Sequence, residues 1–220
     1  MSRKIPRALE PAGIVLLDKP AGISSFAAIA ELRRRTGART GHTGTLDPFA
    51  TGLLVVLSGS ATRLASSFVK LDKRYLTEVD LTSTTSTGDP EGEVVDVHGA
   101  PTRAELDERL AGLRGEVELP IPAASAVKIG GERAYRLHRR GVVVEMPRRR
   151  SQVYALDVIA YRDGVVRLDL RVGSGTYVRA IAAALGGHCR TLRRSEVGPF
   201  SVEEAGPRVI PIDEALARLT

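Results

Sequence analysis

Apolar residues recur along this chain with two different periods, which indicates a mixed α/β protein. Continuous or alternating apolar runs predict strands, because a strand points successive side chains to opposite faces. Apolar residues at helical spacing predict helices between them. The predicted strands are 13–17, 53–57, 75–81, 93–97, 142–144, 153–161 and 165–172, and the predicted helices are 25–35, 60–68, 102–113, 132–140, 177–185 and 213–219.

Two of these helices carry signals at their ends. The helix at 25–35 begins with a Ser in the N-cap position and is followed by Gly37, a residue that suits the left-handed turn after a helix. Thr102 and Glu105 form a capping box that opens the helix at 102–113. The first helix has apolar side chains on one side, namely Phe26, Ile29, Ala30 and Leu32.

Composition bounds the class of protein. The chain has 220 residues, of which 43% are hydrophobic, and this is enough to bury a substantial core. It shows no internal repeat and no long polar linker, so we expect one large domain, alone or with a small appendage. It has no apolar stretch long enough to span a bilayer and no secretory signal, which favours a cytoplasmic protein. The only cysteine, Cys189, lacks the spacing of a zinc site.

The kinds of basic residue in the chain are more informative than the net charge alone. The formal net charge is +6, and the 32 Lys plus Arg include five Lys, which leaves 27 Arg. Arginine binds phosphates through two donors and stacks on bases, so a nucleic-acid partner is one interpretation. Genome composition and solvated faces are an equally weighted alternative. Only 4% of residues are aromatic, so contact with bases has to rest on a few Tyr or Phe side chains.

The segment 41–52 is the densest in chemistry-bearing residues. It contains three Gly, three Thr, His42 and Asp47, and it lies between a predicted helix and a buried strand. Taken alone, such a segment is more often a tight loop held by Thr and Asp side chains. A His and a carboxylate on a loop next to a core strand also suit a catalytic site.

Six ordered blocks of sequence resemble one enzyme family. GHTGTLDPFATGLL at 41–54 is similar to the signature of the bacterial tRNA pseudouridine-55 synthases, the TruB family. The other blocks are GIVLLDKPAGISS at 13–25, KRYLTEVDLTSTTSTGDPEGEV at 73–94, SAVKIGGERAYRLHRRG at 125–141, GSGTYVRAIAAALG at 173–186 and LRRSEVGPF at 192–200. The resemblance implies isomerisation of one uridine in the T-arm loop of tRNA.

The resemblance assigns catalytic roles. Asp47 falls at the essential aspartate of the family, and it would act as a nucleophile or by stabilising or deprotonating the sugar; the sequence leaves these open. Arg179 matches the arginine that pairs with this aspartate and keeps it ionised. Tyr75 matches the tyrosine that stacks on the target base.

The resemblance also implies residues that bind the RNA. Tyr177 and Leu192 match residues that line the uracil site, although each is an ordinary core residue on sequence alone. His42 matches a histidine that fills the space left by the flipped nucleotide, a role that we rank above general base. Lys19, in the turn with Pro20, belongs to an element that supports the active-site loop. The basic residues of an insertion that closes on the RNA would meet phosphates: Lys128, Arg133, Arg136, Arg139 and Arg140.

The resemblance further implies a domain plan. It consists of an N-terminal tail at 1–12, a catalytic domain at 13–208 with an insertion at about 125–150, and a C-terminal helix at 209–220. That helix would be the remnant of a missing RNA-binding domain. The loop before Leu192 is shorter than in the family, and Ser195 stands where a Thr is usual; neither change touches the predicted catalytic residues.

The expected fold is the pseudouridine synthase fold, an α/β (α+β) architecture. It has a mixed, mostly antiparallel central sheet flanked by helices, with the catalytic cleft across the sheet. We expect no metal and no cofactor, because ligand clusters and nucleotide-binding glycine motifs are missing. The expected partner is the T-arm stem-loop of tRNA, with no membrane, no required protein partner and a monomeric enzyme. A tRNA-binding folding assistant and an RNA-guided synthase subunit are the alternatives.

Overall fold

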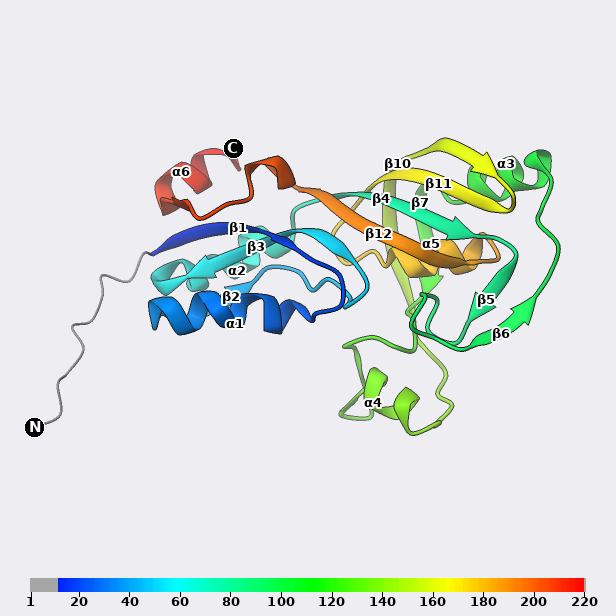
Figure 1. Ribbon diagram of the computed structural model, residues 1–220, viewed down its shortest axis with the longest axis horizontal. Helices are drawn as coiled ribbons and strands as arrows, with labels where there is room; N and C mark the ends of the chain where they lie inside the picture. The colour runs from blue at the N-terminus through cyan, green and yellow to red at the C-terminus, as the bar shows by residue number, and fades with distance from the viewer. Residues whose placement is uncertain (1–11, 220) are drawn as a thin grey trace, which may run out of the picture. The chain divides into compact units, whose positions relative to one another are not determined.

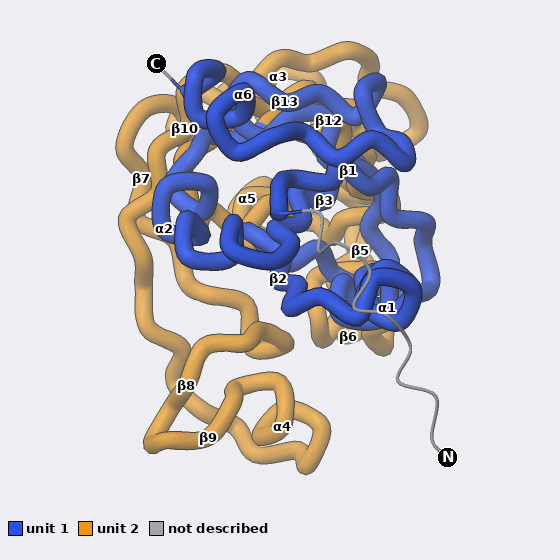
Figure 2. The backbone as a smooth tube through the Cα atoms, turned by 90° about the vertical axis from the view of Figure 1, so that its left-hand side faces the viewer, with its two compact units in different colours: residues 1–73, 193–220 blue, residues 74–192 orange. Residues whose placement is uncertain are grey.

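The computed structural model describes residues 12–219, and the chain forms two compact units. The first unit contains residues 1–73 and 193–220, and the second contains residues 74–192 (Figure 2). Strand β4 (Lys73–Asp80) begins at the boundary, and strand β12 (His188–Val197) runs through it. The units are therefore joined by strand residues rather than by a polar linker.

The first unit is a sheet with helices on both faces. β1 (Gly13–Lys19) lies antiparallel to β14 (Val209–Ile210) and to β3 (Thr51–Ser58), and β2 (Thr40–His42) also pairs with β3. Helix α1 (Ser25–Thr36) covers one face. The other face packs against the 3₁₀ helix η1 (Gly59–Leu64), α2 (Ala65–Val69) and α6 (Ile212–Ala217), with β13 (Phe200–Ser201) and the 3₁₀ helix η2 (Val202–Glu204) nearby in the same core (Figure 1).

The ends of α1 agree with the sequence prediction, but its apolar side does not. Ser24 caps the helix by accepting a hydrogen bond from the backbone N–H of Ala27, and Gly37 is left-handed. Ile29 and Leu32 pack on β1 and β3, whereas Phe26 is 60% exposed. Phe26 therefore lies outside the buried stripe, which is centred on residues 25, 28, 29 and 32.

The second unit also contains a sheet. Its strands follow the order β12, β4, β11 (Val165–Val172), β10 (Arg148–Arg162) and β7 (Gly115–Pro120). Leucines and valines of β10 and β11 are buried. Residues of helices α3 (Arg103–Ala111) and α5 (Val178–Ala184) are buried as well. The capping box predicted for α3 is present. A separate pair of strands joins β5 (Ser83–Thr85) to β6 (Val94–Val97).

The segment at 121–147, between β7 and β10, extends away from the sheet of the second unit (Figures 1 and 2). It contains β8 (Lys128–Ile129), β9 (Glu132–Arg133) and α4 (Ala134–Arg139). We call it the insertion. Its base is closed by a hydrogen bond from the Ile121 N–H to the Pro147 carbonyl.

Several predictions of secondary structure were wrong in part or in full: the helix predicted at 132–140 is shortened to α4 because β9 takes its first two residues, and β7 was not predicted. The strand at 142–144 does not form, and Val143 is 97% exposed there, because no neighbouring strand pairs with it. The helix at 60–68 is divided into η1 and α2. The long strand β12 was missed, because its sequence HCRTLRRSEV is polar and its buried positions include an arginine. The mixed, mostly antiparallel α/β architecture was predicted correctly: β1–β3, β10–β11 and β10–β7 are antiparallel, while β12 runs parallel to β3.

Candidate active site

Asp47 lies on a loop between β2 and β3 that is fixed next to the core of the first unit. Ser25 exchanges two hydrogen bonds with Leu46: its hydroxyl donates to the carbonyl at 2.9 Å and accepts from the N–H at 2.8 Å. The Ala50 N–H donates to the Asp47 carbonyl at 3.1 Å and closes a turn. Leu46 and Ala50 are buried, so the loop is anchored on both sides of the half-buried Asp47.

Lys19 connects this loop to the turn after β1. Its side chain is 1% exposed, and its ammonium donates to the carbonyls of Pro20 and Ile23, both at 2.8 Å, and of Pro48 at 3.2 Å. A buried ammonium needs such acceptors to offset its lost hydration. Lys19 therefore contacts the backbone beside Asp47.

Arg194 holds the other side of the loop. It is buried, and its guanidinium donates to the carbonyls of Leu53 at 2.7 Å and Gly44 at 3.0 Å. β12 passes so close to β3 that a Cβ on Gly52 would lie 2.2 Å from the Arg194 carbonyl oxygen. Gly52 also has a φ of 103°. Glycine is required at this position both by space and by conformation.

His42 ends β2 directly before the loop. Burial and, to a smaller extent, the positive charge of Arg194 lower the pKa of its imidazole. Among the described residues, its buried Nδ1 has no hydrogen-bond partner. The ring is therefore neutral at pH 7, in a form that can pack in an apolar space.

Arg179 is in the first turn of α5, in the second unit, and is 3% exposed. Its guanidinium donates to the carbonyls of Thr87 at 2.7 Å and Ala124 at 2.9 Å, and it lies 3.4 Å from a carboxylate oxygen of Asp89. Ala124 belongs to the base of the insertion. Arg179 thus joins α5, the loop that contains Asp89, and the insertion.

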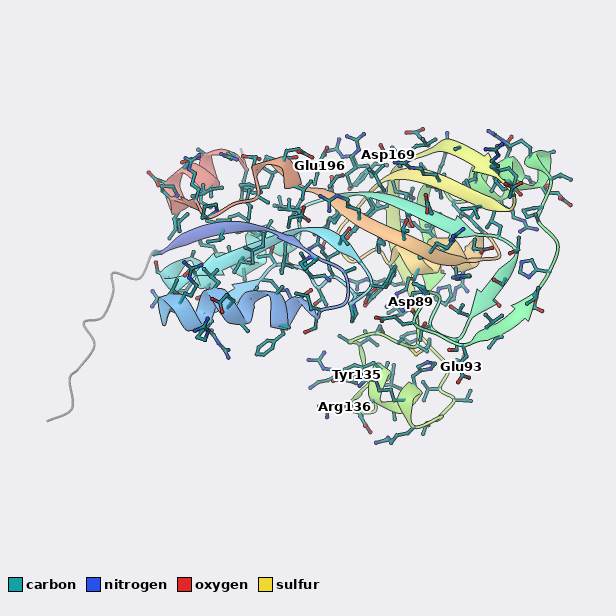
Figure 3. The ribbon with its side chains drawn as sticks, viewed as in Figure 1. Asp89, Glu93, Tyr135, Arg136, Asp169 and Glu196 are labelled. Carbon is teal, nitrogen blue, oxygen red and sulfur yellow. The ribbon has the colours of Figure 1, made fainter. Side chains whose placement is uncertain are left out.

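Asp89 is a buried partner of Arg179 that the sequence did not single out. The carboxylate is buried and also accepts hydrogen bonds from the Thr87 hydroxyl and from the Glu91 N–H at 3.0 Å. Asp89 is labelled in Figure 3. The signal was in the block TSTGDPEGEV, where an aspartate stands between glycine and proline. Its composition indicated only a loop, since burial of the carboxylate depends on Arg179, 90 residues later in the chain.

The other predicted site residues of the second unit lie on regular elements. Tyr75 is buried on β4, Tyr177 is half-buried at the N-cap of α5, and Leu192 is buried on β12. Lys128, Arg133, Arg139 and Arg140 are exposed on the insertion. There the ring of Tyr135 has the guanidiniums of Arg136 and Arg139 at 5.9 and 5.7 Å from its centroid, and Tyr135 and Arg136 are labelled beside α4 in Figure 3.

The predicted site residues are divided between the two units. Lys19, His42 and Asp47 belong to the first unit, and Tyr75, Arg179 and the remaining residues belong to the second. The pairing of Asp47 with Arg179 stays a prediction. Between residues 12 and 219, no helix is both long and apolar enough to cross a membrane, and no three His, Cys, Asp or Glu side chains gather as metal ligands would.

Comparisons with known proteins identify the family. Residues 33–178 match the family described as TruB family pseudouridylate synthase (N terminal domain). The tRNA pseudouridine synthase B of Mycobacterium sp. (strain KMS) is 43% identical over 215 residues, which cover 92% of this chain and 72% of the relative. The protein of the same name from Corynebacterium efficiens is 41% identical over 232 residues, covering 96% of this chain and 78% of the relative.

A solved structure confirms the fold independently. A crystal structure of a Cbf5-Nop10-Gar1 complex superposes with a TM-score of 0.67 at 24% sequence identity, over 91% of this chain and 56% of that one. Identity at this level supports the fold alone, which is the pseudouridine synthase fold expected from the sequence. The family match and the identity to the two bacterial proteins show the family as well as the fold: this chain belongs to the TruB family of pseudouridylate synthases.

Proposed function

We propose that the protein is a tRNA pseudouridine synthase, an isomerase that converts one uridine of tRNA to pseudouridine. The reaction breaks the bond between N1 of uracil and C1′ of the ribose, turns the base and joins C5 to C1′. N1 gains a proton and C5 loses one, so no oxidant or reductant is consumed. The names of the bacterial relatives support this activity.

The observation that carries the proposal is the fixed position of Asp47. A carboxylate can attack the sugar or base as a nucleophile, or it can stabilise or deprotonate the sugar as positive charge develops at C1′. Each role requires an oxygen held at one place against the substrate, and a misplacement of about 1 Å costs large factors in rate. Lys19, Ser25 and Arg194 hold the backbone on both sides of Asp47 and supply this rigidity.

The target that we propose is the T-loop uridine at position 55, flipped out of its stack. The base must leave the loop, because C1′, N1 and C5 are inaccessible inside it. Tyr75, Tyr177 and Leu192 would contact the flipped base, and the neutral ring of His42 would occupy apolar space in the RNA loop. Arg179 would contribute charge near the reacting groups.

The insertion would supply most of the contacts with phosphates. Its basic side chains are exposed, and each phosphate contact adds a salt-sensitive, sequence-independent increment to binding. In this proposal the enzyme acts as a monomer in the cytoplasm on the T-arm of tRNA, without a guide RNA or a protein partner.

Release of tritium from tRNA that carries 5-³H-uridine tests the activity, because C5 loses its hydrogen only when it bonds to C1′. We expect release with the wild-type protein and with Asp107→Ala, which removes an exposed carboxylate of α3, and none with Asp47→Ala. A transcript with cytidine at position 55 should release nothing. Intact tRNA binding without release by the wild-type protein would overturn the proposal and favour a tRNA-binding folding assistant.

A further inference from the structure

Helix α1 has a stripe of side chains on its outer face that the fold of the first unit does not use. Phe26, Ala30 and Arg33 follow one another at helical spacings of four and three residues, so they line one side of the helix. Ile29 and Leu32 already fill the side that packs on β1 and β3. With 60% of Phe26 exposed, the stripe presents an aromatic ring to solvent.

The surroundings of this ring are basic. The guanidinium of Arg33 lies 5.2 Å from the ring centroid, close enough for a cation–π contact. Arg33, Arg34 and Arg35 form the last turn, and Glu31, the helix's only acidic residue, binds Arg34 through its carboxylate. An exposed aromatic ring among arginines suits an anionic partner with flat apolar groups, which is the chemistry of an unpaired nucleotide.

The start of α1 is held to the same loop as the catalytic candidate. Ser25, the residue before Phe26, exchanges both of its hydrogen bonds with Leu46, the residue before Asp47. Lys19 further joins the carbonyls of Ile23 and Pro48. A group bound on Phe26 would therefore be held at a constant position relative to Asp47.

We propose that Phe26 and Arg33 form a stacking site for an unpaired nucleotide of the tRNA substrate, distinct from the uridine that is isomerised. The site rests on the proposed function, since it takes RNA to be the substrate. It would accept any base, because every base has a π-face, and it would set the position of the RNA strand against the catalytic loop.

Affinity measurements in an Asp47→Asn background test this site without turnover. We expect Phe26→Ala and Phe26→Leu to raise the Kd for an unmodified tRNA transcript by about fivefold or more, as loss of one stacked base does. Phe26→Tyr, which keeps the ring, should stay within about twofold. Tyr154→Ala, which removes an exposed ring of β10, is the matched control and should leave the Kd unchanged in this background, and tritium release unchanged where Asp47 is intact.

Since Phe26 is exposed, none of these variants should lower the melting temperature, which separates loss of contact from loss of fold. Wild-type affinity in Phe26→Leu would overturn the site, because a stacking contact needs a ring. A dimer of the wild-type protein in sedimentation that Phe26→Ala dissolves would also overturn it, by assigning the stripe to a second copy of the chain. The proposed function is tested separately: it fails if the wild-type protein releases no tritium.

Discussion

The loop around Asp47 and the insertion are both irregular segments with predicted functional residues, but they are held in opposite ways. The Asp47 loop is tied to its unit by buried polar side chains, with Lys19, Ser25 and Arg194 all bound to its carbonyl or amide groups. The insertion is connected at its base, through Ile121, Pro147 and the contact of Ala124 with Arg179, and its basic side chains face solvent.

This difference in how the two segments are held matches the two functions predicted for them, catalysis and phosphate binding. A catalytic group needs one fixed position, and that position is supplied by hydrogen bonds that are costly to leave unmade in a buried place. Attraction to phosphates depends weakly on exact geometry, so exposed arginines on the insertion are sufficient. Changes in the Asp47 loop should therefore affect chemistry and stability, whereas changes in the insertion should affect affinity and its dependence on salt.

The largest effect is expected from Asp47→Asn. Turnover should fall by about a thousandfold or more, since the reacting carboxylate is lost, while affinity for tRNA stays within about tenfold because it rests on phosphate contacts. Single-turnover tritium release and filter binding measure the two quantities. Equal losses of binding and turnover would contradict this division of roles.

The next largest effect is expected from Lys19→Met, which removes the ammonium under the loop. Three carbonyls lose their donor, so the free energy of unfolding should drop by about 3 kcal/mol, with slower turnover. Urea unfolding measures this, and Lys128→Met is the control, because Lys128 is exposed on the insertion. A similar stability for the two variants would mean that the loop does not depend on Lys19.

A somewhat smaller effect is expected from Asp89→Asn, which removes the negative charge of the buried partner of Arg179. Arg179 in turn contacts the base of the insertion through Ala124. The free energy of unfolding should fall by about 2 kcal/mol, because the guanidinium stays buried with a neutral group in place of the carboxylate. Asp163→Asn changes an exposed carboxylate in the turn between β10 and β11 and should change stability little. If both variants unfold at the same urea concentration, the Arg179–Asp89 pair does not stabilise the second unit.

Arg139→Gln in the insertion should leave stability unchanged and weaken tRNA binding a few-fold. The slope of log Kd against log salt should decrease by about one, as expected for the loss of one phosphate contact. Arg103→Gln, whose side chain is paired with Asp107 on α3, is the control and should keep the full slope. A wild-type salt slope in Arg139→Gln would remove this residue from the RNA contacts.

The smallest effect concerns how the stability of the protein depends on pH through His42, the residue directly before the Asp47 loop. The pKa of His42 is lowered in the folded protein, so below about pH 6.5 the unfolded chain binds this proton more readily than the folded one. Stability should therefore fall as the pH drops from 6.5 through the folded pKa, and His42→Gln should reduce this dependence. An unchanged pH dependence in the variant would assign the effect to other groups.

Several local features could be predicted because neighbouring residues suffice to determine them. The caps of α1 at Ser24 and Gly37 and the capping box of α3 satisfy backbone groups within a few residues. Apolar runs predicted β1 and β3 for the same reason: a strand that is buried on both faces is apolar throughout. The concentration of Gly, Thr, His and Asp at 41–52 also singled out the loop that contains Asp47.

Other features depended on segments that are distant in the sequence. β12 is polar and was missed, yet its Arg194 is buried because it donates to carbonyls 141 and 150 residues earlier in the chain. Asp89 is buried by the guanidinium of Arg179, and Phe26 is exposed because the adjacent positions on α1 already cover the sheet. Nothing close to these residues in the sequence distinguishes them from ordinary surface or core residues.

The sequence by itself determined the family, the mixed α/β class and the identity of the catalytic candidate, because these rest on local pattern and on the order of short blocks. Only the tertiary structure decided which charged side chains are buried and which groups they bind. The physical reason is that an ionised group enters the interior only where acceptors or opposite charges compensate its lost hydration, and for Arg179 and Arg194 those partners come from distant parts of the chain.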